Sequence, residues 1–105
     1  MPADGEAANI AWQPDRDQAV RAIYVQIKCA MGEAYRVARQ AVDQIEELSE
    51  IYSTSGQYDL LAKFYLDPGQ DIGLFVTDRV QTLPGVVDTY TLITFNAFNA
   101  EQRPK

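Results

Sequence analysis

Histidine is absent from the sequence, and cysteine occurs only once, at Cys29. Histidine is the usual base near neutral pH and the commonest metal ligand, so its absence excludes histidine-dependent catalytic triads. Without histidine or a second cysteine, zinc sites of the ordinary kind are excluded as well, and we expect no metal and no cofactor. A lone cysteine cannot form a disulfide within the chain. This fits a reducing compartment, and we expect a cytoplasmic protein.

Long apolar runs are also missing, and positive charge is scarce. No segment approaches the roughly 20 apolar residues that span a bilayer, and the acidic start of the chain lacks the apolar core of a signal peptide. Lys+Arg 9 against Asp+Glu 15 give a formal net charge of -6. Such a chain repels phosphate backbones and anionic lipids, so we expect neither direct nucleic-acid binding nor membrane association.

No sequence motif of catalysis is present: we find no glycine-rich phosphate loop, GxSxG, HExxH or CxxC. Three acids, Glu46, Glu47 and Glu50, lie close together, but short acidic runs are more typical of a solvated edge than of an acid–base pair. Asp78 beside Arg79 is equally typical of a surface pair on a helix. The motifs therefore predict no enzyme.

The residues that are present suffice for one domain, since 105 residues with 47% hydrophobic content allow a single core. Alternating apolar residues predict four strands, over residues 21–29, 48–53, 58–66 and 86–95. Apolar residues at helical spacing predict two amphipathic helices, over residues 34–45 and 72–83. Asp71 is expected to begin the second helix, and Cys29 to be a small core residue of the first strand.

The predicted order is strand, helix, strand, strand, helix, strand, which is the ferredoxin-like βαββαβ arrangement of the α+β class. It implies a four-stranded antiparallel sheet with both helices on one face. We expect a flexible arm over residues 1–19, a folded domain over 20–96 and a polar tail over 97–105. The uncovered face would carry Tyr24, Leu61 and Tyr65, which is too apolar for water alone and predicts a second protein layer.

The loop between the second and third strands, residues 53–59, is richer in functional groups than a plain turn requires. It holds Gly56, Gln57, Tyr58 and Asp59 after two serines and a threonine, which suggests the mouth of a small-ligand site. A hairpin loop whose polar residues face water is the more common explanation of such a composition. Thr89 and Thr91 are likewise ordinary strand residues or hydroxyls at a polar rim.

Taken together, these segments resemble the effector-binding domain of the Lrp/AsnC family, also called the RAM domain. The resemblance covers about residues 20 to 95. It rests on the segments 51–63, 76–86 and 89–93, which include the Gly-x-Tyr-Asp loop and Pro-Gly-Val ahead of a Thr-x-Thr strand. The family comprises the feast/famine transcriptional regulators, so the resemblance implies a non-enzymatic domain that senses an amino acid.

The resemblance also implies an assembly and a site. Such domains dimerise through their sheets as a dimeric α+β barrel and form rings of dimers, with the amino-acid effector between dimers. By position, the ligand residues would be those of the effector loop and three less closely matched residues: Gly56, Gln57, Tyr58, Asp59, Asp78, Thr89 and Thr91.

One departure from the family concerns DNA binding. Family regulators begin with a helix-turn-helix domain, for which residues 1–20 are too few, so we expect a stand-alone sensing domain that joins full-length Lrp/AsnC-type regulators in mixed rings or acts alone. An alternative is a small dimeric α+β barrel enzyme of monooxygenase-like type. A pocket beneath the helices of one subunit would favour that enzyme, whereas a pocket between dimers would favour the sensor.

Overall fold

The computed structural model of the chain describes residues 20–98. The predicted arm, residues 1–19, lies outside the described residues, as does most of the predicted tail. Residues 94–98, which follow the last strand, have no regular secondary structure. The predicted domain boundaries therefore stay predictions.

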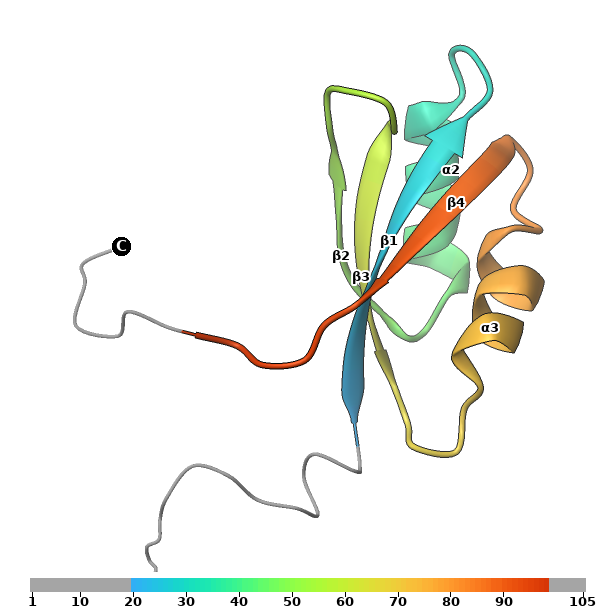
Figure 1. Cartoon of the computed structure of the whole chain (residues 1–105). Coiled ribbons are helices and arrows are strands. Elements are labelled where there is room, and N and C mark those ends of the chain that lie inside the picture. The colour runs from blue at the N-terminus through green and yellow to red at the C-terminus, as the bar shows by residue number, and fades with distance from the viewer. Residues whose placement is uncertain (1–19, 99–105) are drawn as a thin grey trace, which may run out of the picture.

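The described residues form a single four-stranded antiparallel sheet with the helices on one of its faces (Figure 1). The strand order is β2-β3-β1-β4, and the chain order confirms the predicted ferredoxin-like arrangement. The elements are β1 (Arg21–Cys29), α2 (Ala34–Gln44), β2 (Leu48–Ser53), β3 (Leu60–Leu66), α3 (Ile72–Phe75), the π-helix η1 (Val76–Val80) and β4 (Val86–Ile93).

The second helical segment differs from the regular helix that its apolar spacing predicts. It begins as expected, with the Asp71 carboxylate accepting the Leu74 N–H at 3.0 Å, which is the hydrogen bond of an N-cap. After Phe75 it widens into η1, where the Gln81 N–H donates to the Val76 carbonyl five residues earlier, at 2.8 Å. A stripe of apolar residues reports which side of a helix is buried, but it does not report this change of hydrogen-bond spacing.

Two strands are also shorter than predicted. β3 begins at Leu60 instead of residue 58, because the side chain of Asp59, and not a backbone carbonyl, accepts the Cys29 N–H. β4 ends at Ile93 instead of residue 95, where its register partner is Ile23, close to the start of β1. Both differences lie at the ends of the elements, where local side-chain bonds and the length of the partner strand decide the boundary.

The inner face of the sheet is a closed aliphatic and aromatic core. Ile23, Val25 and Ile27 of β1 are 0% exposed, and Cys29 is buried beside them, as its position on the apolar face predicted. Phe64 of β3 meets Phe75 of α3 edge to face, with ring centroids 5.1 Å apart. Such pairs add to the stabilisation that burial supplies. Both helical segments thus pack on this face.

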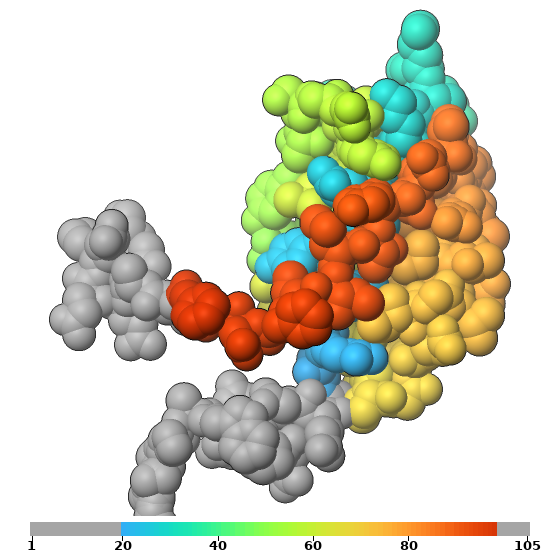
Figure 2. Space-filling view, in the orientation of Figure 1, coloured from blue at the N-terminus to red at the C-terminus, as the bar shows by residue number. Residues whose placement is uncertain are grey.

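The outer face of the sheet carries large side chains that no other element of residues 20–98 covers. Tyr52, Tyr65 and Tyr90 are 55%, 44% and 53% exposed. In the space-filling view, side chains of the central strand β1 (blue) reach the surface between those of β2 and β4 (Figure 2). This confirms the predicted apolar second face.

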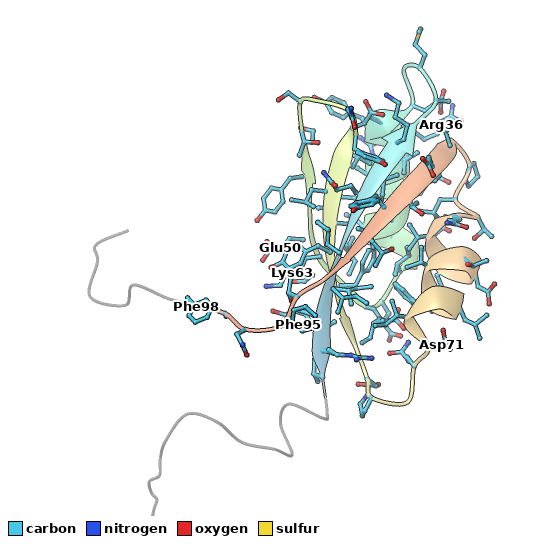
Figure 3. All side chains as sticks on the ribbon, viewed as in Figure 1. Arg36, Glu50, Lys63, Asp71, Phe95 and Phe98 are labelled. Carbon is cyan, nitrogen blue, oxygen red and sulfur yellow. The ribbon has the colours of Figure 1, made fainter. Side chains whose placement is uncertain are left out.

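Two residues of opposite charge are register partners at this outer face. Lys63 is opposite Glu50 in the β2–β3 register, and Figure 3 shows the two side chains on neighbouring strands. The Lys63 ammonium lies 5.0 Å from the ring centroid of Tyr65 and 5.8 Å from that of Tyr24, within cation–π distance. The face therefore combines aromatic area with the opposite charges of Lys63 and Glu50.

Gly85 fixes the start of β4 against α2. Its φ of +98° is in the left-handed region, and a Cβ there would lie 2.9 Å from Cγ2 of Val37. The Gly85 carbonyl accepts the Ala30 N–H at 2.8 Å, so the β1–α2 turn and the beginning of β4 are joined. This turn forms one wall of the site described next.

Candidate functional site

The hairpin loop between β2 and β3 is stabilised by hydrogen bonds among its own polar groups. The Thr54 N–H donates to the Asp59 carbonyl at 2.9 Å, and the Thr54 hydroxyl donates to the Tyr58 carbonyl at 3.0 Å. Gly56 lies at the tip with φ +107°, and a Cβ there would meet nothing within 4 Å. Within one protomer, Gly56 is therefore needed for backbone conformation and not for close packing.

Asp59 has a structural role that its place in a polar loop does not reveal. One carboxylate oxygen accepts the Cys29 N–H at 2.7 Å, and the Asp59 N–H donates to the Ile27 carbonyl at 2.9 Å. Asp59 thus joins the end of β1 to the beginning of β3. Its position is set by the sheet, so its negative charge is held at a fixed place beside the hairpin.

The position of Asp59 also affects the pKa of the Cys29 thiol. Burial raises the pKa of Cys29, and the negative charges of Asp59 and Glu33 raise it further. A thiol with a raised pKa stays protonated near neutral pH and is a weak nucleophile. Cys29 therefore acts as a small neutral group toward the residues around it.

One pocket lies between the hairpin and the first turn of α2, and we call it the helix-side pocket. Its volume is about 590 Å³. It is lined by Lys28, Cys29, Ala30, Met31, Gly32, Ala34, Tyr35 and Asp59. The charged side chains in this lining are Lys28 and Asp59, and most of the remaining lining is apolar.

A second pocket lies on the other side of the hairpin, against the outer face of the sheet, and we call it the sheet-side pocket. Its volume is about 370 Å³, and it is lined by Gln26, Ser55, Gln57, Tyr58 and Tyr90. Tyr58 and Tyr90 form its aromatic part, with ring centroids 6.2 Å apart. This pocket is mostly polar, with two amides, a hydroxyl and two phenols.

The predicted ligand residues divide between these places. Asp59 lines the helix-side pocket, Gln57 and Tyr58 line the sheet-side pocket, and Gly56 forms the tip between them. The structure thus brings the four loop residues to one end of the sheet. Their contact with a ligand stays a prediction.

The other three predicted residues line neither pocket. Asp78 is exposed on η1, where its carbonyl accepts the Thr82 hydroxyl at 2.7 Å. Thr89 accepts the Gln81 side-chain amide at 2.8 Å, and the register places Thr89 and Thr91 opposite Ile27 and Val25, toward the helices. Within one protomer, the structure does not group these three residues with the hairpin pockets, and their part in a site also stays a prediction.

Several residues of the two pockets were not singled out from the sequence. Lys28 and Gln26 belong to the more polar side of the predicted first strand, and Tyr90 to the last strand. The antiparallel register of β1 and β3 carries Lys28 to the hairpin end, because Ile27 pairs with Leu60. That register could have indicated Lys28, whereas Met31 and Tyr35 depend on the path of the β1–α2 turn.

A separate polar cluster joins the helical layer to the sheet. The Arg79 guanidinium lies 3.2 Å from a Glu47 oxygen, and the Gln70 amide donates to the other oxygen at 2.9 Å. Burial raises the pKa of Glu47, but the hydrogen bonds from Gln70 and from its own backbone N–H, with the charge of Arg79, outweigh it and leave the pKa below its ordinary value. The recorded ion pair of Arg79 is thus with Glu47 and not with the neighbouring Asp78.

Residues 20–98 contain no group of three or more histidine, cysteine, aspartate or glutamate side chains arranged to hold a metal ion. In the same range, none of the helices has the length and apolar character needed to cross a membrane.

The fold and the hairpin agree with one known family. The model of the Lrp/AsnC ligand-binding domain matches residues 22–104. The chain belongs to this family. The HTH-type transcriptional regulator FL11 of Pyrococcus abyssi is 33% identical over 70 residues, which cover 67% of this chain and 45% of FL11. The chain spans less than half the length of the curated relatives it matches.

Solved structures share the fold of this chain. FFRP-DM1 is 25% identical with a TM-score of 0.66, covering 71% of this chain and 99% of its own. TTHA0845 of Thermus thermophilus is 28% identical with a TM-score of 0.63, covering 75% and 98%. The Neisseria meningitidis regulator NMB0573, solved as a complex with L-Met, shares the fold with a TM-score of 0.69 at 14% identity, covering 90% and 66%. The chain is a regulatory sensing domain of the Lrp/AsnC kind.

Proposed function

We propose that this domain is a non-enzymatic, cytoplasmic sensor that binds an α-amino acid at its hairpin end. In this proposal it assembles as sheet-paired dimers and then as rings of dimers, with the ligand between dimers. Binding would change the assembly or its contacts with partner regulators, which is how the domain would report the ligand.

The observation that carries the proposal is the pair of opposite charges in the helix-side pocket. An α-amino acid presents an ammonium and a carboxylate on the same carbon, so its recognition needs one anion and one cation at neighbouring positions. Asp59 and Lys28 line the same pocket, and Asp59 is held by its bond to the Cys29 N–H. Charge-assisted hydrogen bonds from such a pair supply both affinity and orientation.

The open form of the pocket supports a site between dimers. Met31 is 99% exposed and Tyr35 is 76% exposed, although both line the pocket. A ligand held only by this protomer would keep much of its surface in water, whereas small-molecule sites usually bury most of the ligand. A neighbouring dimer would supply the missing wall.

The uncovered outer face of the sheet supports the sheet-paired dimer. Aromatic and aliphatic side chains lie across all four strands of that face, which is typical of an interface and not of a solvated surface. Phe95 and Phe98, which follow β4, lie away from the sheet and are almost fully exposed (Figure 3). They add apolar area that a partner chain would cover.

The amino-acid class is supported by the family, and NMB0573 is one member solved with an amino acid. The space between the sheet and the helices favours a sensor over an enzyme. An enzyme of the dimeric α+β barrel type would use a pocket there, but Ile23, Val25 and Phe64 fill that layer and are 0% exposed. Full-length regulators with the same domain are the natural partners for mixed rings, because they would present a matching sheet face.

The test combines calorimetry with light scattering on the purified chain. Titration with each of the twenty L-amino acids should give binding by at least one of them at micromolar to millimolar concentration. In light scattering, the same ligand should change the average mass of the oligomer or reduce the number of oligomeric species. If the chain is folded and dimeric but binds none of them, the proposal is wrong.

A further inference from the structure

We infer that the helix-side pocket selects an amino acid with a large apolar side chain. Lys28 and Asp59 hold the backbone of the ligand, and Met31, Ala34 and Tyr35 contact its side chain. This inference rests on the proposed function and narrows it to a class of effector.

The distribution of polar groups in the pocket is the first reason. Both charged side chains come from the hairpin end, since Lys28 is the last but one residue of β1 and Asp59 precedes β3. The rest of the lining comes from the end of β1, the β1–α2 turn and the first turn of α2, and it consists of alanine, methionine, glycine, cysteine and the Tyr35 ring. A ligand whose charged atoms meet Lys28 and Asp59 therefore directs its side chain toward apolar atoms.

The neutral state of Cys29 strengthens this separation. Cys29 is 7% exposed and lies next to the charged end, where burial and the Asp59 charge raise the pKa of its thiol. A protonated thiol behaves as a small apolar group with only a weak hydrogen-bond donor. The pocket thus changes from charged to apolar within a short distance along its lining.

The size of the pocket fits the long members of the apolar class. A volume of about 590 Å³ is well within the range of small-molecule sites and leaves room beyond the ammonium and carboxylate of an amino acid. A glycine or alanine ligand would leave most of that space to water. Methionine, leucine and phenylalanine would cover the exposed atoms of Met31 and Tyr35.

The sheet-side pocket shows what a site for a polar side chain would look like. Gln26, Ser55 and Gln57 offer hydrogen-bond donors and acceptors, whereas the helix-side pocket has no amide or hydroxyl side chain in its lining except the Tyr35 phenol. An amide side chain moved from water to an apolar surface loses hydrogen bonds that are not replaced. The two sides of the hairpin therefore predict opposite ligand preferences.

The test uses ligand pairs of almost equal size. We expect L-methionine to bind at least about 10-fold more tightly than L-glutamine, and L-leucine more tightly than L-asparagine, because a site that leaves an amide unpaired discriminates against it by this order. Calorimetry on the assembled protein gives both constants. If the amides bind as well as or better than the apolar partners, this inference is wrong while the proposed function stands.

Two variants on α2 locate the site. Tyr35→Gln should weaken binding of L-methionine about 10-fold, because Tyr35 lines the pocket. Val42→Gln is the matched control, since Val42 is also exposed on α2 and lines a second surface hollow together with Tyr35, but it does not line the helix-side pocket. Equal losses from both variants would contradict the assignment, and circular dichroism would show whether each variant is folded.

A third variant separates the two sides of the hairpin. Gln57→Ala changes the sheet-side pocket without touching the helix-side lining. If Gln57→Ala abolishes binding and Tyr35→Gln does not, the ligand lies on the sheet side and this inference is overturned. If the folded dimer binds no amino acid at all, both the proposed function and this inference fail.

Discussion

The two faces of the sheet use the same strands for different purposes. Along β1, Ile23, Val25 and Ile27 point to the helices and are 0% exposed, while Tyr24 and Gln26 between them are partly exposed on the other face. The inner face is closed and mostly aliphatic with Phe64 at its centre, and the outer face is open and rich in tyrosine. The inner face therefore stabilises the protomer, and in our proposal the outer face is reserved for a second chain.

If the two faces differ in this way, the largest loss of stability is expected from a substitution at the centre of the inner face. Phe64→Ala should lower the free energy of unfolding by about 3–5 kcal/mol, because it removes a 0% exposed ring and leaves a cavity against Phe75. Urea denaturation followed by circular dichroism measures the loss.

Tyr65→Ala is the control for this variant, because Tyr65 is the next residue of β3 and lies on the outer face. It should cost much less at protein concentrations where the protomer is a monomer, since its ring is 44% exposed. Equal losses from the two variants under those conditions would mean that the faces do not differ in the way described.

The outer face predicts a large effect on assembly with a small one on folding. Leu61→Asp places a negative charge in the middle of the sheet face, on a strand with neighbours on both sides. We expect light scattering to show a fall from dimer to monomer, because an unpaired charge in an apolar interface is strongly unfavourable.

Leu74→Asp is the matched control, because Leu74 is a surface leucine that lies on α3, whereas Leu61 is partly exposed on the sheet. It should leave the solution mass unchanged. A dimer that persists in Leu61→Asp and dissociates in Leu74→Asp would show that the interface is formed by the helical layer and not by the sheet.

Substitutions of Asp59 test the role of the hairpin, which lies at the end of the sheet where its two faces meet. Asp59→Ala leaves the Cys29 N–H without its acceptor and should cost about 1–3 kcal/mol of stability. Asp59→Asn keeps an oxygen that can accept the same N–H but removes the charge, so it should cost less. Comparing their unfolding curves and their affinities for L-methionine separates the structural role of the residue from its ligand role.

The binding result has a clear expected sign. If Asp59 holds the ligand ammonium, Asp59→Asn should weaken binding by at least about 10-fold while the protein stays folded, because the charge-assisted bond is lost. Unchanged affinity in a folded Asp59→Asn variant would mean that Asp59 is only a link between β1 and β3. The ligand would then need a different anion.

The order and type of the elements could be predicted because each depends on a period in the sequence. The alternation in residues 21–29 and the helical spacing of Val37 and Ala41 both place apolar atoms on one side, and burial follows directly from that. The same alternation predicted the apolar outer face through Leu61 and Tyr65. The periodicity of apolar residues was sufficient to predict an element wherever neighbouring residues alone determine it.

The site was predicted less completely because its residues meet through register and turn geometry. The Gly-x-Tyr-Asp loop was recognisable, but Lys28 reaches it only because β1 and β3 are antiparallel neighbours. The bond between Asp59 and the Cys29 N–H joins residues 30 positions apart, and no period in the sequence reports it. The expected ligand roles of Asp78 and Thr89 came mainly from the family resemblance, and the protomer does not bring these two residues to the hairpin.

The smallest predicted effect concerns the polar link recorded between η1 and the turn that precedes β2. Glu47 keeps a pKa below its ordinary value of 4.5, through Gln70, its own N–H and Arg79, so its stabilising effect is present above that pH and is lost as the pH falls through the lowered value. Because the Arg79 side chain is 40% exposed, solvent screens the pair, and the contribution should be below about 1 kcal/mol.

Glu47→Gln should therefore flatten the dependence of unfolding free energy on pH below about 4.5, where the wild type loses this contribution. Glu46→Gln, on the neighbouring exposed residue, is the control and should leave the slope as in the wild type. Urea denaturation at several pH values measures both slopes. A larger change from Glu46→Gln would mean that the acid response belongs to the exposed turn. The helices would then be held on the inner face of the sheet by apolar contacts, with no measurable contribution from the Glu47–Arg79 link. The two faces of the sheet would differ more strongly in that case, because polar contacts would matter only on the outer face.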